Sequence, residues 1–229
     1  NDTLIGGAGI DQYDGGAGTD DILEFYDVLA LGGGVSHRVW VDLSKADADG
    51  NAATSGVVID DGYSVSTITD ENNIAEQGIQ GIENLGGTGY GDTLIGNDSS
   101  NKIYGYSGND LLQGRGGIDY LYGGASQDIL VGGDDDDFLY GEEDNDTFYG
   151  GKGKDIIDGG TTGDDAVAYN AVYTGDTALT TGVYVDLTTQ KVYNDGYASD
   201  TTNGIDTLVS IERVFGSSLA IWHSKITKK

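Results

Sequence analysis

The chain has 229 residues and a formal net charge of −28 at pH 7, and it contains 40 Gly but no Pro, Cys or Met. Without Cys there are no disulfides, and with only two His the usual ligands of zinc and copper are scarce. The negative charge excludes nucleic acid as a partner, because its phosphates would be repelled, and no stretch is long and apolar enough to be a transmembrane segment.

The chain opens with a short block of glycine- and aspartate-rich units, residues 1–23. Two units of nine residues begin at Gly6 and Gly15, and the residues before Gly6 match the end of an earlier unit. Each unit supplies one acid at the same place, and these acids are Asp2, Asp11 and Asp20. Because the block begins inside a unit, we expect the array to extend before Asn1.

Two segments without the repeat, residues 24–86 and 168–220, resemble each other. Residues 39–43 read VWVDL and residues 183–187 read VYVDL, and each segment closes with an Ile-Glu pair, at Glu83 and at Glu212. The alternation of apolar and polar residues predicts strands with one buried face. Because the end of a roll exposes apolar side chains and unpaired strand edges, we predict that both segments are strand-rich linkers or caps.

Residues 87–167 form the main block, with nine units of nine residues in one register. Glycine opens every unit, at Gly87, Gly96, Gly105, Gly114, Gly123, Gly132, Gly141, Gly150 and Gly159. The sixth position carries Asp92, Asn101, Asp110, Asp119, Asp128, Asp137, Asp146, Asp155 and Asp164. The eighth position carries Leu94, Ile103, Leu112, Leu121, Leu130, Leu139, Phe148, Ile157 and Ala166. Such a period predicts a solenoid, because a unit this short has to stack on its neighbours.

Residues 221–229 form a tail that is basic and unlike the rest of the chain. Ile221 stands where the next unit would have its aspartate, so we expect the array to stop there. The sequence assigns no role to this tail.

The glycines of each unit indicate a tight turn. Glycine at the first, second and fourth positions allows left-handed or crowded backbone angles, so that the carbonyl groups of the turn can converge. Asp135 and Asp144 replace the fourth glycine in two units, and aspartate tolerates the left-handed region better than most residues. The turns that carry Tyr90, Ser99, Ser126 and Thr162 at this position are expected to be looser, or to bind an ion more weakly.

If two units complete one coil, the acids separate into two columns with a spacing of roughly 4.8 Å. One column holds Asp92, Asp110, Asp128, Asp146 and Asp164, and the other holds Asn101, Asp119, Asp137 and Asp155. Stacked carboxylates repel one another unless a cation lies between them, and Ca²⁺ accepts both carboxylate and carbonyl oxygens. Filling every gap predicts about seven calcium ions in the main block, with one more between Asp2 and Asp20. Folding is then conditional on calcium.

Two alternative roles of the acids stay open. They could form a solvated surface that suits high salt, although a surface needs no nine-residue register. They could also belong to a calcium-free solenoid, which leaves the charge of the columns uncompensated.

The repeat resembles the nonapeptide of RTX (repeats-in-toxin) proteins. This resemblance covers roughly half of the chain and implies an all-β fold, a parallel β-roll (a right-handed β-solenoid of nonapeptide repeats) with strand-rich flanking or capping segments. It also implies a fragment of a larger bacterial RTX polypeptide, a toxin or an adhesin, that leaves the cell by type I secretion and folds on meeting calcium outside. The expected location is extracellular or at the cell surface.

Catalysis is not predicted, because His37 and His223 are the only imidazoles and neither lies in a nucleophile or metal motif. A second hypothesis is adhesion, in which the roll is a spacer or docking surface of an adhesin or S-layer. The flanking segments or outward tyrosines would then contact a glycan or a neighbouring protein; these tyrosines are Tyr104, Tyr122, Tyr140 and Tyr149. A third hypothesis is a folding accessory of a secreted enzyme.

Overall fold

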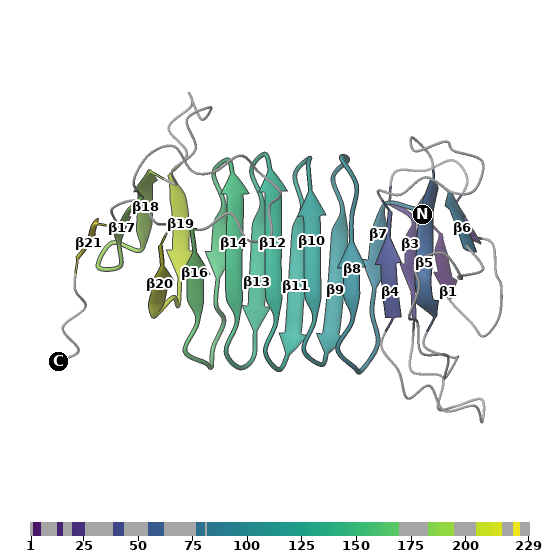
Figure 1. The fold of residues 1–229 in the computed structure, drawn as a ribbon, viewed down its shortest axis with the longest axis horizontal. Helices are drawn as coiled ribbons and strands as arrows, with labels where there is room; N and C mark the ends of the chain where they lie inside the picture. Colours follow the sequence, from purple (N-terminus) through teal and green to yellow (C-terminus); the bar gives the residue numbers. More distant parts are fainter. Residues whose placement is uncertain are drawn as a thin grey trace.

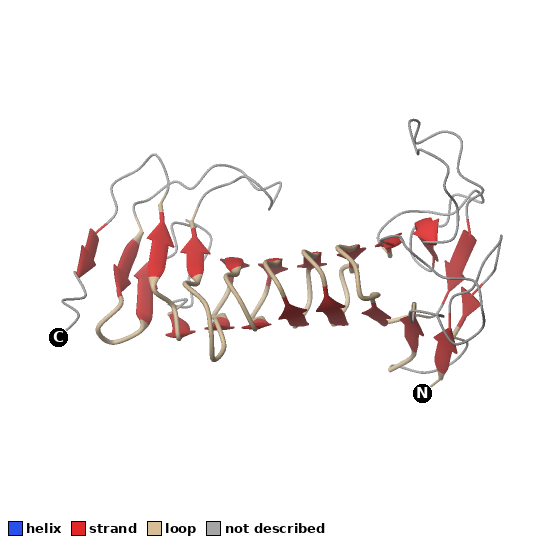
Figure 2. Cartoon of the chain, turned by 90° about the horizontal axis from the view of Figure 1, so that it is seen from below, coloured by secondary structure: helices blue, strands red, loops and turns tan. Residues whose placement is uncertain are grey.

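The computed structural model describes residues 2–5, 13–15, 20–25, 39–43, 55–61, 77–80, 82–169, 183–194, 205–216 and 222–224. The regular structure of these residues is entirely β, and two sheets face each other along the molecule (Figures 1 and 2). The described part of the chain has no helix that is long and apolar enough to cross a membrane. The fold is a parallel β-roll, as the repeat predicts.

The first sheet, sheet A, has eleven strands in the order β1-β3-β7-β9-β11-β13-β15-β19-β18-β17-β21. Their bounds are β1 Thr3–Ile5, β3 Ile22–Glu24, β7 Asn84–Gly86, β9 Lys102–Ser107, β11 Tyr120–Ala125, β13 Phe138–Glu142, β15 Ile156–Asp158, β17 Tyr184–Asp186, β18 Lys191–Asn194, β19 Asp206–Val209 and β21 Trp222–Ser224.

The second sheet, sheet B, has ten strands in the order β2-β6-β5-β4-β8-β10-β12-β14-β16-β20. Their bounds are β2 Tyr13–Asp14, β4 Val39–Asp42, β5 Ser55–Asp61, β6 Gln77–Gln80, β8 Thr93–Ile95, β10 Leu111–Arg115, β12 Ile129–Asp134, β14 Thr147–Lys152, β16 Ala166–Ala168 and β20 Arg213–Phe215.

Successive units of the main block alternate between the two sheets, so two units complete one coil of eighteen residues. Leu112 of β10 is in register with Leu94 of β8 on one side and with Leu130 of β12 on the other, and these strands are parallel. The eighth residue of each unit points inward, and the side chains from Leu94 to Ile157 at this position are fully buried. One continuous apolar core therefore runs along the roll and contributes to its stability through burial.

The two segments outside the main block enter the sheets in the same way. In the first, β4, β5 and β6 form an antiparallel meander; β6 pairs in parallel with β2, and β4 pairs in parallel with β8. In the second, β17, β18 and β19 form the same meander; β19 pairs in parallel with β15, and β17 pairs in parallel with β21. Each meander is thus inserted between two parallel strands of one sheet, as Figure 1 shows at the two ends of the roll.

This shared topology explains the resemblance between the two segments at the level of the backbone. The boundaries at residues 24–86 and 168–220 as separate units stay a prediction. Strand β21 takes the place in the second copy that β8, the first strand of the main block, takes in the first. The expected stop at Ile221 lies outside the described residues.

Candidate metal centre

The acids of the sixth position form two buried columns, each linked through the backbone. In the first column the N–H of Asp92 donates to Oδ1 of Asp110 at 2.6 Å, and the same contact joins Asp110 to Asp128 at 2.9 Å. In the second column the N–H of Asp119 donates to Oδ1 of Asp137 at 2.8 Å. The residues from Asp92 to Asp155 at this position are at most 2% exposed. One carboxylate oxygen of each acid is therefore used to hold the neighbouring coil in register.

The second carboxylate oxygen is different in the interior of the columns. Oδ2 is buried and has no hydrogen-bond partner among the described residues in Asp110, Asp119, Asp128, Asp137 and Asp146. A buried ionised group without a compensating partner is costly. Burial accordingly raises the pKa of Asp128 to about 7, of Asp110, Asp119 and Asp146 to about 8, and of Asp137 to about 9. A cation bound beside these five oxygens would stabilise their ionised carboxylates.

The opening glycines leave room for these oxygens. A Cβ built on Gly132 would come to 2.5 Å from Oδ2 of Asp137 and to 2.5 Å from the carbonyl oxygen of Gly150 in the next coil. The other opening glycines of the main block likewise face the acid of their own unit, including Asp165 opposite Gly159, except that Gly96 faces the side-chain oxygen of Asn101. The opening glycine is therefore required for space, because a side chain would fill the place where a carboxylate and a carbonyl oxygen converge.

The left-handed backbone lies at two of the three positions for which the sequence predicted left-handed or crowded angles. Positive φ occurs at the second and fourth positions, whereas no opening glycine of the main block has it. The fourth residues Asp135 and Asp144 have φ of 80° and 73°, as expected, and Ser126 adopts φ of 89° although we expected it to fit poorly. At the second position three units carry side chains at positive φ, at Tyr106, Arg115 and Glu142, which sequence reasoning missed.

The turn that opens at Gly87 has another conformation, in which its own residues form hydrogen bonds to its acid. Its second and fourth residues, Thr88 and Tyr90, do not have positive φ. The N–H of Thr88 donates to Oδ2 of Asp92 at 2.6 Å, and the hydroxyl of Thr88 lies 3.1 Å from the same oxygen. Oδ1 of Asp92 accepts the N–H of Val39 at 2.7 Å. Both oxygens of this acid are thus satisfied by the protein.

The turn that opens at Gly96 also satisfies its own polar residue, and this explains why the residue is Asn101. Its side-chain oxygen accepts the N–H of Asn97 at 2.9 Å, while its amide nitrogen donates to the carbonyl oxygen of Glu83 at 2.6 Å. In the interior of the column the preceding coil offers a backbone N–H to the sixth residue, but at Asn101 the preceding coil offers the carbonyl of Glu83. An amide can donate to that carbonyl, whereas a carboxylate at this position would be repelled by it.

The columns continue into the inserted segments through residues that the spacing did not reveal. Oδ1 of Asp206 accepts the N–H of Asp155 at 3.1 Å, and its Oδ2 accepts the hydroxyl of Tyr169 at 3.1 Å. Glu83 accepts the N–H of Asp21 at 2.9 Å, and Glu212 accepts the N–H of Asp165 at 3.0 Å. The Ile-Glu pair that closes both segments was the sequence signal for the two glutamates.

Two acids chosen from the spacing are displaced by one residue. The turn after Gly159 is one residue longer than the others, so the column position belongs to Asp165, whose Oδ1 accepts the N–H of Asp146 at 2.8 Å. Asp164 is exposed and lies 3.4 Å from the guanidinium of Arg213. Its unit places Val167, and not Ala166, in register with Phe148.

In the N-terminal block the position belongs to Asp21, which is 1% exposed and accepts the N–H of Asp2 through Oδ1. Asp20 instead pairs with Lys102 at 2.7 Å, and this ion pair lowers its pKa. Asp2 is exposed, and Asp11 lies outside the described residues.

The residues of the interior turns fit a calcium ion better than a transition metal. In the described part of the chain no three acidic or imidazole side chains come together, so each turn offers one buried carboxylate. The other ligands would have to be backbone carbonyls, of which Gly150 O beside Asp137 is an example. Calcium takes such mixed oxygen sets in flexible geometry, whereas zinc and copper prefer nitrogen and sulfur.

The space beside the opening glycines can be tested by one methyl group. We expect Gly132→Ala to lower the free energy of unfolding by about 1–3 kcal/mol, since the neighbouring oxygens must move. Gly116→Ala is the matched control, because a Cβ there has no neighbour closer than 3.7 Å, and it should change stability by less than about 0.5 kcal/mol. Urea unfolding at saturating calcium measures both; equal effects would contradict the steric explanation.

The raised pKa values predict a pH dependence of the calcium-free fold. The stability that these carboxyls contribute is fully present below their unfolded pKa of about 4 and is lost as the pH rises through about 7 to 9 in the fold. Metal-free protein should therefore show more strand structure by circular dichroism at pH 6 than at pH 9. Strand content that rises from pH 6 to pH 9 in excess chelator would contradict this.

Comparison with known families agrees with the geometry. The family of the RTX calcium-binding nonapeptide repeat (4 copies) matches residues 1–22, 86–121, 104–139 and 131–166. No curated protein matches the chain significantly. The matched residues contain the turns and strands of the roll, including the five interior aspartates with a partnerless oxygen. The repeat units in residues 1–22 and 86–166 are therefore RTX calcium-binding nonapeptide repeats.

Proposed function

We propose that this chain is a calcium-dependent folding module of a larger secreted protein. In calcium-poor surroundings the columns of buried carboxylates oppose folding, and in calcium-rich surroundings bound ions allow the coils to close. The single observation that carries this proposal is the row of five buried carboxylate oxygens without a hydrogen-bond partner among the described residues. The net charge of −28 supports an extended calcium-free chain, which suits passage through a narrow export channel.

The proposed calcium ligands are the interior acids and the carbonyls beside them. The acids are Asp110, Asp119, Asp128, Asp137 and Asp146, each facing the opening glycine of its own unit. At ten times the dissociation constant, a site stabilises the fold by about 1.4 kcal/mol. Five such sites contribute about 7 kcal/mol, which is comparable to the whole stability of a typical domain. We therefore expect the chain to be folded as a roll when calcium is bound and unfolded when calcium is absent.

The ends of the columns are proposed to hold no ion, because protein donors already occupy them. Thr88 satisfies Asp92, the amide of Asn101 meets the carbonyl of Glu83, and the hydroxyl of Tyr169 meets Asp206. The ion-binding part of the main block is then its interior, and fewer ions bind than the seven that the spacing predicts. The coils beside the inserted segments need calcium least.

Calcium titration of the metal-free chain tests the proposed function. Circular dichroism should change from a disordered to a strand-rich spectrum as calcium is added, and equal magnesium should leave the chain disordered. Asp137→Asn should raise the calcium midpoint at least twofold, because it removes one proposed ligand. Asp136→Asn removes the same charge from an exposed neighbour that is not a proposed ligand, and it should raise the midpoint less than Asp137→Asn does. A strand-rich spectrum in excess chelator at neutral pH would overturn the proposal.

The protein donors at the ends of the columns lead to a separate prediction about the number of bound ions. Tyr169→Phe removes the hydroxyl that donates to Oδ2 of Asp206 at 3.1 Å, so this oxygen loses one protein donor. We expect calcium binding by equilibrium dialysis to increase by about one ion per chain, or the calcium midpoint to rise as that end loses stability. An unchanged stoichiometry together with an unchanged midpoint would show that the hydroxyl does not close the column.

A further inference from the structure

A groove runs along the outer face of sheet A, between a row of tyrosines and the turns at one edge of the roll. It has a volume of about 530 Å³ and crosses four coils. Its residues are Tyr106, Tyr122, Gly124, Ala125, Tyr140, Glu142, Glu143, Asp158, Gly160 and Thr161. The described roll places this groove outside the aspartate columns, whose acids are buried between the sheets.

Glycine at the second position of alternate coils makes the groove hollow. Tyr106, Gly124, Glu142 and Gly160 occupy this position in four successive coils of the same edge. The side chains of Tyr106 and Glu142 rise on either side of Gly124, which has none. At about 4.8 Å per coil the four coils span about 14 Å, which is the length of roughly four residues of an extended peptide.

A row of stacked tyrosines borders the groove, and the aromatic stacking ends at Tyr140. Tyr104, Tyr122 and Tyr140 stack with centroid distances of 4.9 and 5.1 Å and with planes within 10° of parallel. Each inner face of this stack is covered by the next ring. Beyond Tyr140 the residue in register on β15 is Asp158, which is not aromatic. The last ring of the row therefore lies next to a carboxylate.

The negative charge of the groove favours a positively charged occupant. Glu142, Glu143 and Asp158 contribute three carboxylates, and none of the residues that line the groove is basic. The basic residue of the strands beneath this face, Lys102, pairs with Asp20 at 2.7 Å. A cation beside Tyr140 would interact with the ring and with the carboxylates together. A neutral sugar could use the ring face but would leave the three charges uncompensated.

We propose that this groove binds an extended basic peptide segment of a partner protein, with an arginine or lysine side chain between Tyr140 and the carboxylates of Glu142, Glu143 and Asp158. The groove belongs to the folded roll, so this inference rests on the proposed calcium-dependent fold. Binding is then available only after calcium has folded the chain.

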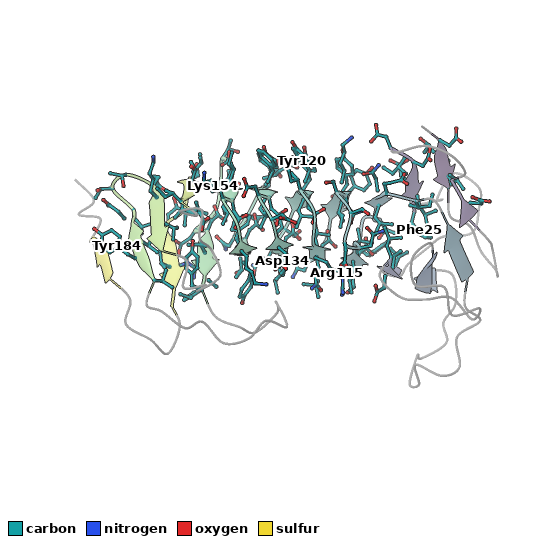
Figure 3. All side chains as sticks on the ribbon, turned by 90° about the horizontal axis from the view of Figure 1, so that it is seen from above. Phe25, Arg115, Tyr120, Asp134, Lys154 and Tyr184 are labelled. Atoms are coloured by element: carbon teal, nitrogen blue, oxygen red, sulfur yellow. The ribbon has the colours of Figure 1, made fainter. Side chains whose placement is uncertain are left out.

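The test uses hexa-arginine as the probe, titrated into the calcium-loaded chain in 150 mM NaCl. The double variant Glu142→Gln/Glu143→Gln should weaken binding about tenfold, and Tyr140→Leu about three- to fivefold. Asp134→Asn/Asp136→Asn is the control for net charge: it removes two carboxylates from another part of the surface, of which Asp134 pairs with Lys152 at 2.6 Å, and it should weaken binding less than twofold. Figure 3 shows Asp134 on the side of the roll opposite Tyr120 of sheet A.

The outcomes distinguish binding in the groove from attraction elsewhere on the chain. Equal weakening by the two double variants would show attraction to net charge alone, and no binding of the probe would overturn the proposal. Binding of maltohexaose to the groove, in place of binding of the peptide, would assign the groove to a glycan. Circular dichroism of every variant in calcium shows whether the roll has folded, so failure of the calcium-dependent fold is recognised independently of failure of the groove.

Discussion

The roll depends on how its buried carboxylates are neutralised. Stacking the coils requires the sixth residue of each unit to accept an N–H from the adjacent coil, and only one carboxylate oxygen is needed for this contact. The remaining oxygen is buried with it, because the opening glycine and the next coil surround it. A carboxylate therefore fixes the register of the coils well, but burying its charge is costly. A bound cation would offset that cost.

The structure shows two solutions to this conflict in one column. In the interior the second and fourth residues of the turn have positive φ, and Oδ2 has no partner among the described residues. In the turn that opens at Gly87 the backbone lacks positive φ, and Thr88 donates its N–H to the acid instead. The backbone of the turn thus decides whether the protein itself satisfies the second carboxylate oxygen. The same choice explains why Asn101 is found where the neighbouring coil offers a carbonyl.

The sequence predicted the parts of the structure that follow from a strict period. The two columns, the inward eighth residue and the alternation of the units between two faces depend only on repeat length, and they are found as expected from Asp92 to Asp155. The period could not show where one residue is added, so Asp164 was chosen in place of Asp165 and Asp20 in place of Asp21. Asp206, Glu83 and Glu212 were missed because their contacts join segments that are distant in sequence.

The two inserted meanders show how a roll can be interrupted without an exposed edge at the interruption. Each meander presents one strand in parallel to the preceding coil and another in parallel to the following coil, so both neighbours keep a hydrogen-bonded partner. The glutamates Glu83 and Glu212 then re-enter the columns at the place of an aspartate, and their longer side chains reach the N–H of Asp21 and of Asp165. Since the backbone at Glu83 faces the next coil with its carbonyl, that coil cannot use an aspartate there. The insertion therefore sets the residue type in the coil that follows it, and it sets where the row of partnerless carboxylate oxygens begins.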